Sequence, residues 1–517
     1  MLRLLTNIPL PIHLLLIAFI FILRLPSLIG GFYLEEESLY FLCAQRIAEG
    51  GNLYKDAWLA GPPFMVMLYW FAFKLFGGAT IIAMRIIACF YLYFSAIYFN
   101  GIIESYRLFK RTPYFSGFLF AFLASIPWYV QSFNSSLFVL FPIIFSFHVI
   151  IRLNERRHKS YALLFQVGAL MSICVLATYK TVFILLGIMI AYLIIVSPKV
   201  DELLAMMGGV FFVVIAMIIG MFFSGNLLHF WDIGCLFYLD RIRMGTEQLY
   251  DYEVMRAFIT WGLHWGIIIL LAIFGFIHYR LRFFNYIVKI RSFEFTMRIW
   301  LFIMIIALIF KLRRLELQDF ILLVPPIVFY AGKSMDFQWN SFMRLLAVAV
   351  GLGVSFYSFS GYFAMAYPRA FEYFLPQEHN QFLHGGLYTQ FQEDNPIKEF
   401  IKAKQITSDV WIMDNDPSLY LQLGLECPNK YTDFRIAYNK MESFRAASDF
   451  HYYSKVESHG NTFSQFYNQP PKYIIDTEKK FSYLKNKYPG LFSDYKLIGQ
   501  ELWIYKNQAI SSFEKNR

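Results

Sequence analysis

The chain has 517 residues, of which 58% are hydrophobic and 16% charged, and its mean hydropathy is +0.47. These values lie outside the range of soluble globular proteins and indicate a membrane protein. The net charge is +10, but the basic residues stand in short segments between apolar ones, which favours membrane orientation over nucleic-acid binding. The five cysteines and ten histidines show no zinc-binding spacing and no disulfide framework.

Eleven apolar stretches are candidate membrane spans. Several are shorter than the roughly 20 residues that a span needs, and we expect these to be tilted, buried or extended by snorkelling Lys and Arg. The first lacks a small-residue cleavage site and is predicted to be an uncleaved span. The stretches are 8–23, 80–100, 113–130, 137–151, 161–178, 182–196, 203–223, 257–277, 299–310, 320–330 and 342–362.

Three basic clusters, at 107–111, 152–159 and 279–298, are predicted to be cytoplasmic by the positive-inside rule. Two spans separate the first pair of clusters and four separate the second, so the three agree with one another. The N-terminus is then inside and the C-terminus outside. The apolar stretch 63–77 would break this parity as a span, and we expect it to lie along the outer surface as an amphipathic or re-entrant element.

From about residue 368 the hydropathy falls and short strand-like runs appear at 409–413, 472–476 and 502–506. Helical patterns at 397–404 and 479–487 alternate with them, which favours a small α/β domain. The predicted fold class is a polytopic α-helical membrane protein of about 11 spans with a C-terminal external α/β domain. Its predicted domains are 1–367, a transmembrane domain with an external acidic loop at 30–77, and 368–517, an external (periplasmic) α/β domain.

Three adjacent carboxylates, Glu35, Glu36 and Glu37, stand in the acidic loop after the first span. An ionisable cluster at a membrane boundary is a candidate functional site that handles protons or cations. The alternative is a solvated loop rich in charge.

A second basic group, Lys311 with Arg313 and Arg314, falls on the outer side, against the positive-inside trend. An anionic ligand such as a phosphate would explain it. The alternative is that these residues neutralise Glu316 and Asp319.

The N-terminal motifs are Glu36-Glu37-x-x-Tyr40, Asn52-Leu-Tyr54-x-Asp56, Pro62-Pro63, Leu75-Phe-Gly77 and Arg85. In order and spacing they resemble the start of polyprenyl-phosphate-dependent glycosyltransferases of the GT-C class, family 39-like, such as protein O-mannosyltransferases and the aminoarabinose transferase of lipid A. Arg313-Arg314, followed by Pro325-Pro326, resembles the family's basic loop and the Pro-containing helix after it.

The resemblance implies an inverting transfer of a sugar from a polyprenyl-phosphate-sugar donor to an acceptor protein, lipid or glycan. This would occur on the outer face of the cell inner (plasma) membrane. It places Glu36 at the family's catalytic Asp, with Glu37 beside it as an orienting or metal-proximal residue. A single base suits an inverting displacement from a good leaving group. The metal requirement stays open, with Glu35 and Glu37 as candidate ligands of a divalent metal. The candidate substrate-binding residues are Tyr40, Tyr54, Lys55, Asp56, Lys180, Arg313 and Arg314.

Three positions depart from the family pattern: Glu36 replaces Asp, Gly61 replaces a basic residue and Asn134 replaces an acidic one. Lys55 or Lys180 could supply the lost positive charge, although snorkelling also accounts for Lys180. The departures allow a divergent enzyme, or a non-catalytic scaffold or assembly factor for cell-envelope export. A transporter ranks third, because charged residues are scarce at the centres of the spans.

The pair Gly208-Gly209 lies inside an apolar stretch. Small residues in membrane helices let two backbones approach closely. We therefore expect a helix-packing contact at this pair.

Overall fold

The computed structural model divides into two compact units. Unit 1 comprises residues 1–30, 81–219 and 241–385, and unit 2 comprises 31–80, 220–240 and 386–517. The structure describes residues 8–29, 34–59, 61–109, 112–125, 130–155, 160–236, 262, 265–277, 288–309, 317–336, 341–358, 396–413, 417–427, 470–476, 480–487, 493–498 and 501–505.

Unit 1 is a bundle of helices in which neighbours along the chain and distant segments both pack together. Helix α7 packs against α8 and α9, α9 against α14, α14 against α15, and α6 against α2 and α15. The helices that lie wholly or mainly in this unit are α2 (Leu10–Ile29), α5 (Thr80–Ser105), α6 (Phe115–Ser125), α7 (Ser135–Glu155), α8 (Tyr161–Ala177), η3 (Tyr179–Thr181), α9 (Val182–Val196), α10 (Val200–Phe223), a short apolar helix at Trp265–Ile277, α14 (Val288–Ile309), η7 (Leu317–Leu323), α15 (Val324–Met335) and α16 (Ser341–Ser358).

Every predicted span contains at least part of a described helix, which makes this a multi-pass helical membrane protein. The count of eleven is not confirmed, because only five described helices are long and apolar enough to cross a membrane. These five are Leu10–Leu28, Phe64–Ser105, Ser135–Leu153, Tyr179–Val196 and Val200–Phe223. The span predicted at 320–330 is a 3-10 helix, η7, followed by the short helix α15.

Helices α8 and α10 approach so closely that their glycines leave no room for a side chain. A Cβ atom at Gly209 would lie 2.0 Å from the carbonyl oxygen of Phe165, and one at Gly168 would lie 1.9 Å from that of Met206. At Gly208 the nearest atom would be 3.8 Å away, on the Phe165 ring. The expected helix-packing contact is therefore confirmed, and Gly209 makes it.

We expect Gly209→Ala to destabilise the protein by about 1–3 kcal/mol, because the added methyl group must push two backbones apart. Gly208→Ala is the matched control, since its methyl group meets only ordinary van der Waals contact. Thermal unfolding of the two variants in detergent measures the difference. Equal melting temperatures would show that α8 and α10 do not pack at Gly209.

Unit 2 brings the N-terminal acidic segment together with the C-terminal part of the chain. It contains α3 (Glu35–Ala48), α4 (Phe64–Phe76), α11 (Leu227–His229) and the π-helix η4 (Phe230–Leu236). Helix α3 packs against α4 on one side, and α21 (Ser418–Leu423) also contacts it. The segment predicted at 63–77 is thus a helix, α4, while its position along the membrane surface stays a prediction.

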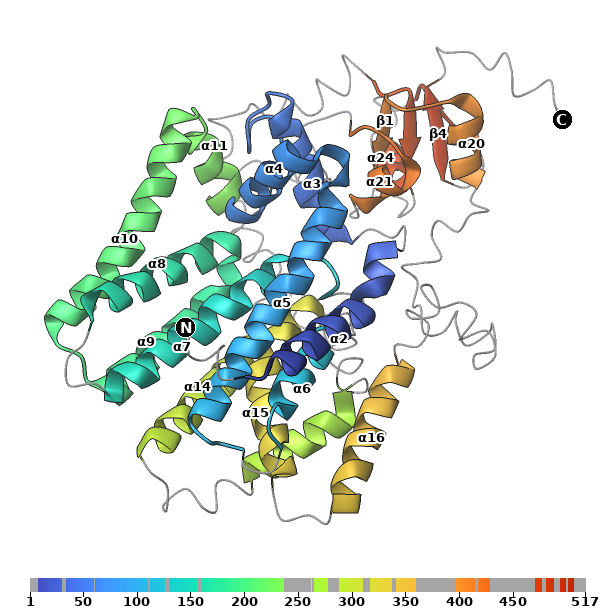
Figure 1. Ribbon diagram of the computed structural model, residues 1–517. Helices are drawn as coiled ribbons and strands as arrows, with labels where there is room; N and C mark the ends of the chain where they lie inside the picture. Colours follow the sequence, from blue (N-terminus) through green and yellow to red (C-terminus); the bar gives the residue numbers. More distant parts are fainter. Residues whose placement is uncertain are drawn as a thin grey trace. The chain divides into compact units, whose positions relative to one another are not determined.

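A four-stranded sheet forms the C-terminal part of unit 2. Its strand order is β1-β2-β4-β3, with β1 (Val410–Ile412) parallel to β2 (Tyr473–Ile475) and the other pairs antiparallel. Strands β1, β2 and β4 (Leu502–Tyr505) are the three predicted strands, whereas β3 (Tyr495–Ile498) and α21 were not predicted. Figure 1 shows α20 (Pro396–Lys404), α21 and α24 (Lys480–Lys487) beside the sheet.

The division into a transmembrane domain at 1–367 and an external domain at 368–517 stays a prediction. Packing groups the chain in another way, because 31–80 and 220–240 pack with 386–517. The small sheet is present within this larger unit, and an α/β domain extending over all of 368–517 is not confirmed.

Candidate functional site

The three adjacent glutamates form the first turn of helix α3, so the prediction that they lie in a loop is wrong. Leu34 precedes the helix with extended backbone, φ −95° and ψ 145°. Carboxylates in the first turn are stabilised by the positive end of the helix dipole, which explains why a helix can begin on three of them. Glu35 is exposed, Glu36 is half-buried and Glu37 is buried.

Glu37 stabilises the start of this helix. Its Oε1 accepts a hydrogen bond from the backbone N–H of Leu34 at 3.1 Å, as a glutamate at the third helical position does in a capping box. The side chain has no exposed surface. The structure therefore gives Glu37 a role in folding, and its proposed orienting role stays a prediction.

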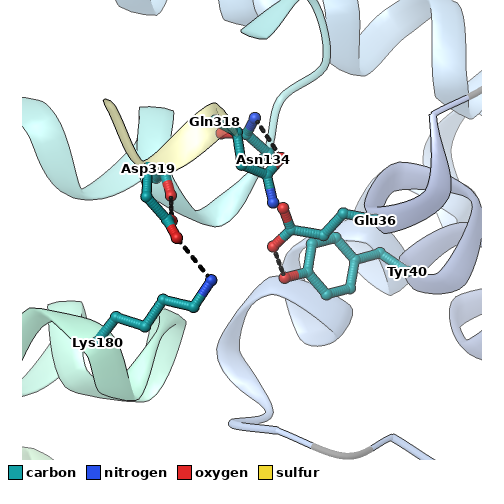
Figure 2. Close-up of polar contacts among 7 residues, drawn as sticks. Glu36, Tyr40, Asn134, Lys180, Gln318 and Asp319 are labelled. Atoms are coloured by element: carbon teal, nitrogen blue, oxygen red, sulfur yellow. Dashed lines mark hydrogen bonds and ion pairs between the residues drawn. The ribbon is translucent and has the colours of Figure 1, made fainter. Parts of the chain in front are cut away.

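Glu36 is the half-buried glutamate of the three, and its Oε2 atom is buried. The hydroxyl of Tyr40, one turn further along α3, donates a hydrogen bond to Glu36 Oε1, and Figure 2 shows the phenol ring pointing toward it. Tyr40 is itself buried against the ring of Tyr69 from α4, with ring centroids 5.6 Å apart. Packing between α3 and α4 thus fixes the phenol, and the phenol fixes the carboxylate.

The loop between α3 and α4 is built by two of the predicted substrate-binding residues. Tyr54 is fully buried, adopts a φ of +67°, and donates from its hydroxyl to the carbonyl oxygen of Gly61 at 2.8 Å. Asp56 accepts a hydrogen bond from the backbone N–H of Asn52 at 2.8 Å. Lys55, between them, is exposed. Tyr54 and Asp56 therefore shape the loop, and a substrate contact by any of the three stays a prediction.

Unit 1 holds a separate polar cluster, at the first turn of α7 and the short helices η3 and η7. Lys180 Nζ lies 2.7 Å from Asp319 Oδ2, and the hydroxyl of Ser136 donates to Asp319 Oδ1 at 2.7 Å. Figure 2 shows the Lys180 side chain extended toward the Asp319 carboxylate. Snorkelling alone therefore does not account for Lys180, and Asp319 has an ion-pair partner other than the neighbouring arginines.

The same cluster is fixed by a second contact between α7 and η7. Asn134 precedes α7, and its Oδ1 accepts a hydrogen bond from the backbone N–H of Leu137 at 2.7 Å. Its Nδ2 donates to Gln318 Oε1 at 3.0 Å. Two successive residues of η7, Gln318 and Asp319, are thus bound to the N-terminal end of α7, through Asn134 and Ser136.

Sequence reasoning named Lys180 and Asn134 but missed Ser136, Gln318 and a functional role for Asp319. The predicted topology could have pointed to them, because it places residues 134–136, 180 and 311–319 on the same side of the membrane. Arg313 and Arg314, with Lys311 and Glu316, lie outside the described residues. Their predicted role in phosphate binding stays a prediction.

Among the described residues, no three His, Cys, Asp or Glu side chains come together in a way that could hold an ion. Glu37 is engaged by the helix start, and the two oxygens of Asp319 are engaged by Lys180 and Ser136. A metal-binding role for Glu35 and Glu37 stays a prediction that nothing in this arrangement supports.

No protein-family model matches the chain, and no curated protein matches it. Solved structures do match it, and they are GT-C glycosyltransferases, the class that the N-terminal motifs resemble. ArnT from Cupriavidus metallidurans in the apo state is 13% identical, with 92% of this chain and 88% of that chain covered and a TM-score of 0.41. The Archaeoglobus fulgidus oligosaccharyltransferase tethered with an acceptor peptide is 13% identical, with coverages of 94% and 72% and a TM-score of 0.49.

AglB from Archaeoglobus fulgidus, in complex with an inhibitory peptide and a dolichol-phosphate, is also 13% identical. The match covers 94% of this chain and 72% of the AglB chain, with a TM-score of 0.49. At this identity and these TM-scores, the likeness assigns no role to any residue of this chain.

Proposed function

We propose that this chain is an integral membrane glycosyltransferase that moves a sugar from a polyprenyl phosphate to an acceptor on the outer face of the inner membrane. One observation carries the proposal. Glu36 and Tyr40, the two residues at the centre of the N-terminal motif, are joined by a hydrogen bond in the first two turns of α3. This leaves a half-buried, oriented carboxylate at a helix N-terminus, which suits a general base.

The reaction needs one base and one stabilised leaving group. Glu36 takes the proton of the acceptor hydroxyl or amine while the acceptor attacks the anomeric carbon. The bond between that carbon and the phosphate oxygen breaks, and the phosphate departs with the electron pair. A single displacement inverts the anomeric centre. Tyr40 keeps the carboxylate oriented, and cationic side chains are needed to stabilise the charge that develops on the phosphate.

Four cations are candidates for the phosphate: Lys55, Lys180, Arg313 and Arg314. The charge of Lys180 is balanced by Asp319, so most of the net attraction for a phosphate falls to the two arginines and to the exposed Lys55. Arginine also suits the task chemically, because its guanidinium can bind a phosphate through two parallel hydrogen bonds.

We expect Arg313→Ala/Arg314→Ala to weaken binding of a polyprenyl phosphate about tenfold or more, since each lost charge-assisted contact contributes about 1.5–3 kcal/mol. Changing both to Lys restores part of the affinity, because a point charge cannot form the bidentate contact. Titration of the purified full chain with the lipid phosphate measures this. Lys402→Ala/Lys404→Ala, on an exposed face of α20, is the control with the same loss of charge. Unchanged affinity in the first variant would show that these arginines only balance nearby acids.

The orientation is testable by cysteine labelling in intact cells or spheroplasts. A membrane-impermeant reagent should label a cysteine introduced near Gly460 and should miss one near His158, because the predicted topology places the former outside and the latter inside. Protein level is measured in parallel for both variants. Labelling near His158, or its absence near Gly460, would contradict this topology and the outer location of Glu36.

A further inference from the structure

A second buried carboxylate of unit 1 belongs to Glu294 on α14. It stands in the basic segment 279–298, which is predicted to be cytoplasmic, and before the span predicted at 299–310. The residue is fully buried, and its side chain is 1% exposed. Burial takes a carboxylate out of water and favours its neutral form unless charges and hydrogen-bond donors replace the water. The contacts of Glu294 therefore decide which form the folded chain holds.

Only one of the two carboxylate oxygens of Glu294 is hydrogen-bonded within the described part of the chain. Oε1 accepts from Nη2 of Arg298, one turn further along the same helix. Oε2 is buried and has no hydrogen-bond partner among the described residues. Asp319 differs in this respect, because both of its oxygens accept hydrogen bonds. An ionised Glu294 thus leaves a charged oxygen in the interior without a donor, and such a group is costly.

Few charges act on Glu294 from the helices around it. Arg298, on its own helix, is the first, and Lys333, on α15, is the second. The ammonium of Lys333 also donates to the carbonyl oxygen of Leu108 at 3.1 Å. The titratable hydroxyl of Tyr330, on α15, interacts electrostatically with Glu294 as well. As far as the structure describes them, the other elements that pack on α14, namely α7, α9 and η7, contribute no charge.

We propose that Glu294 takes up a proton near neutral pH and makes the contact between α14 and α15 a pH-sensitive element of the fold. Burial raises the pKa of this carboxyl from its ordinary value of 4.5 to about 7, and Arg298 and Lys333 limit the rise. The folded chain therefore binds the proton more tightly than the unfolded chain does. This contribution to stability is complete below about pH 4.5 and is lost as the pH rises to about 7.

Thermal unfolding of the purified full chain at about pH 5 and at about pH 8 tests the proposal without any assay of transfer. Glu294→Gln fixes this position in a neutral form that can still accept from Arg298. At the lower pH the variant and the wild-type chain should melt at similar temperatures. At the higher pH the variant should melt several degrees above the wild-type chain, in which the carboxyl has ionised. Glu399→Gln, the same change at an exposed position of α20, is the control and should follow the wild-type chain at both pH values.

Arg298→Met gives a second result, one that a loss of packing alone does not produce. Removing the guanidinium favours the neutral carboxyl of Glu294. The pH at which stability falls should therefore rise by about one unit or more, the size of effect expected for a neighbouring opposite charge. The double variant Glu294→Gln/Arg298→Met should show no such fall in stability.

Two results would overturn the assignment. One is a difference in melting temperature between Glu294→Gln and the wild-type chain that does not grow with pH. The other is an Arg298→Met variant whose stability falls at the same pH as that of the wild-type chain. If Glu294→Gln does not fold, the pH dependence of Arg298→Met still decides whether Glu294 is the group that takes up the proton.

Discussion

A Glu36→Gln variant should transfer sugar about 10²- to 10⁴-fold more slowly than the wild-type chain, the range expected for loss of a general base. Gln keeps the size and shape of the side chain and can still accept the hydrogen bond from Tyr40. The change removes the negative charge and with it the capacity to take a proton. Complementation of a deletion strain, with protein level measured in parallel, tests the expectation.

The two neighbouring glutamates are matched controls for Glu36. Glu35→Gln should have little effect, because Glu35 is exposed. Glu37→Gln retains an acceptor for the backbone N–H of Leu34 and should preserve the protein level, whereas Glu37→Ala should lower it by losing the cap. Full complementation by Glu36→Gln at normal protein level would exclude catalysis by this carboxylate and favour the scaffold function.

Asp319→Ala should destabilise the protein by about 3–5 kcal/mol, the usual cost of removing one partner of a buried ion pair. The ammonium of Lys180 would be left with most of its side chain out of water and without its counter-charge. The variant also breaks the contact between Ser136 and η7. Thermal unfolding in detergent, together with the yield of folded protein, measures the loss.

Two further variants separate the contribution of the ion pair to stability from the contribution of packing. Ser136→Ala removes one hydrogen bond to a charged group and should cost about 1.5–3 kcal/mol. The double variant Lys180→Met/Asp319→Leu removes both charges, and it should be more stable than Asp319→Ala alone because no unpaired charge remains. A double variant that is less stable than Asp319→Ala would show that the ion pair contributes little.

Much of the architecture follows from hydropathy, since each predicted span contains part of a described helix. The three predicted strands also have the pattern of apolar residues that is typical of strands. The start of α3 was missed for a physical reason. A run of Glu35, Glu36 and Glu37 indicates a solvated loop by charge alone, but the same carboxylates are stabilising when they occupy the first turn of a helix. The apolar residues 39–44 that follow them are the part of the sequence that indicates a helix.

The polar contacts in unit 2 and those in unit 1 differ in how far they could be predicted. Glu36 and Tyr40 are four residues apart, so a helix brings them together as soon as it forms. Lys180 and Asp319 are 139 residues apart and meet only through the packing of the bundle. From sequence alone, the nearest basic residues to Asp319 are Arg313 and Arg314, which is why the ion pair with Lys180 was not predicted.

The contact between α3 and α21 has a consequence for how the protein is made. Helix α3 ends at Ala48, and the segment Ser418–Leu423 that packs on it leaves the ribosome hundreds of residues later. At a translation rate of about 5–20 residues per second, the helix that carries Glu36 waits on the order of tens of seconds for this partner. A chain that stops before residue 418 therefore never completes the packing of α3, and incomplete translation products cannot acquire the finished environment of Glu36.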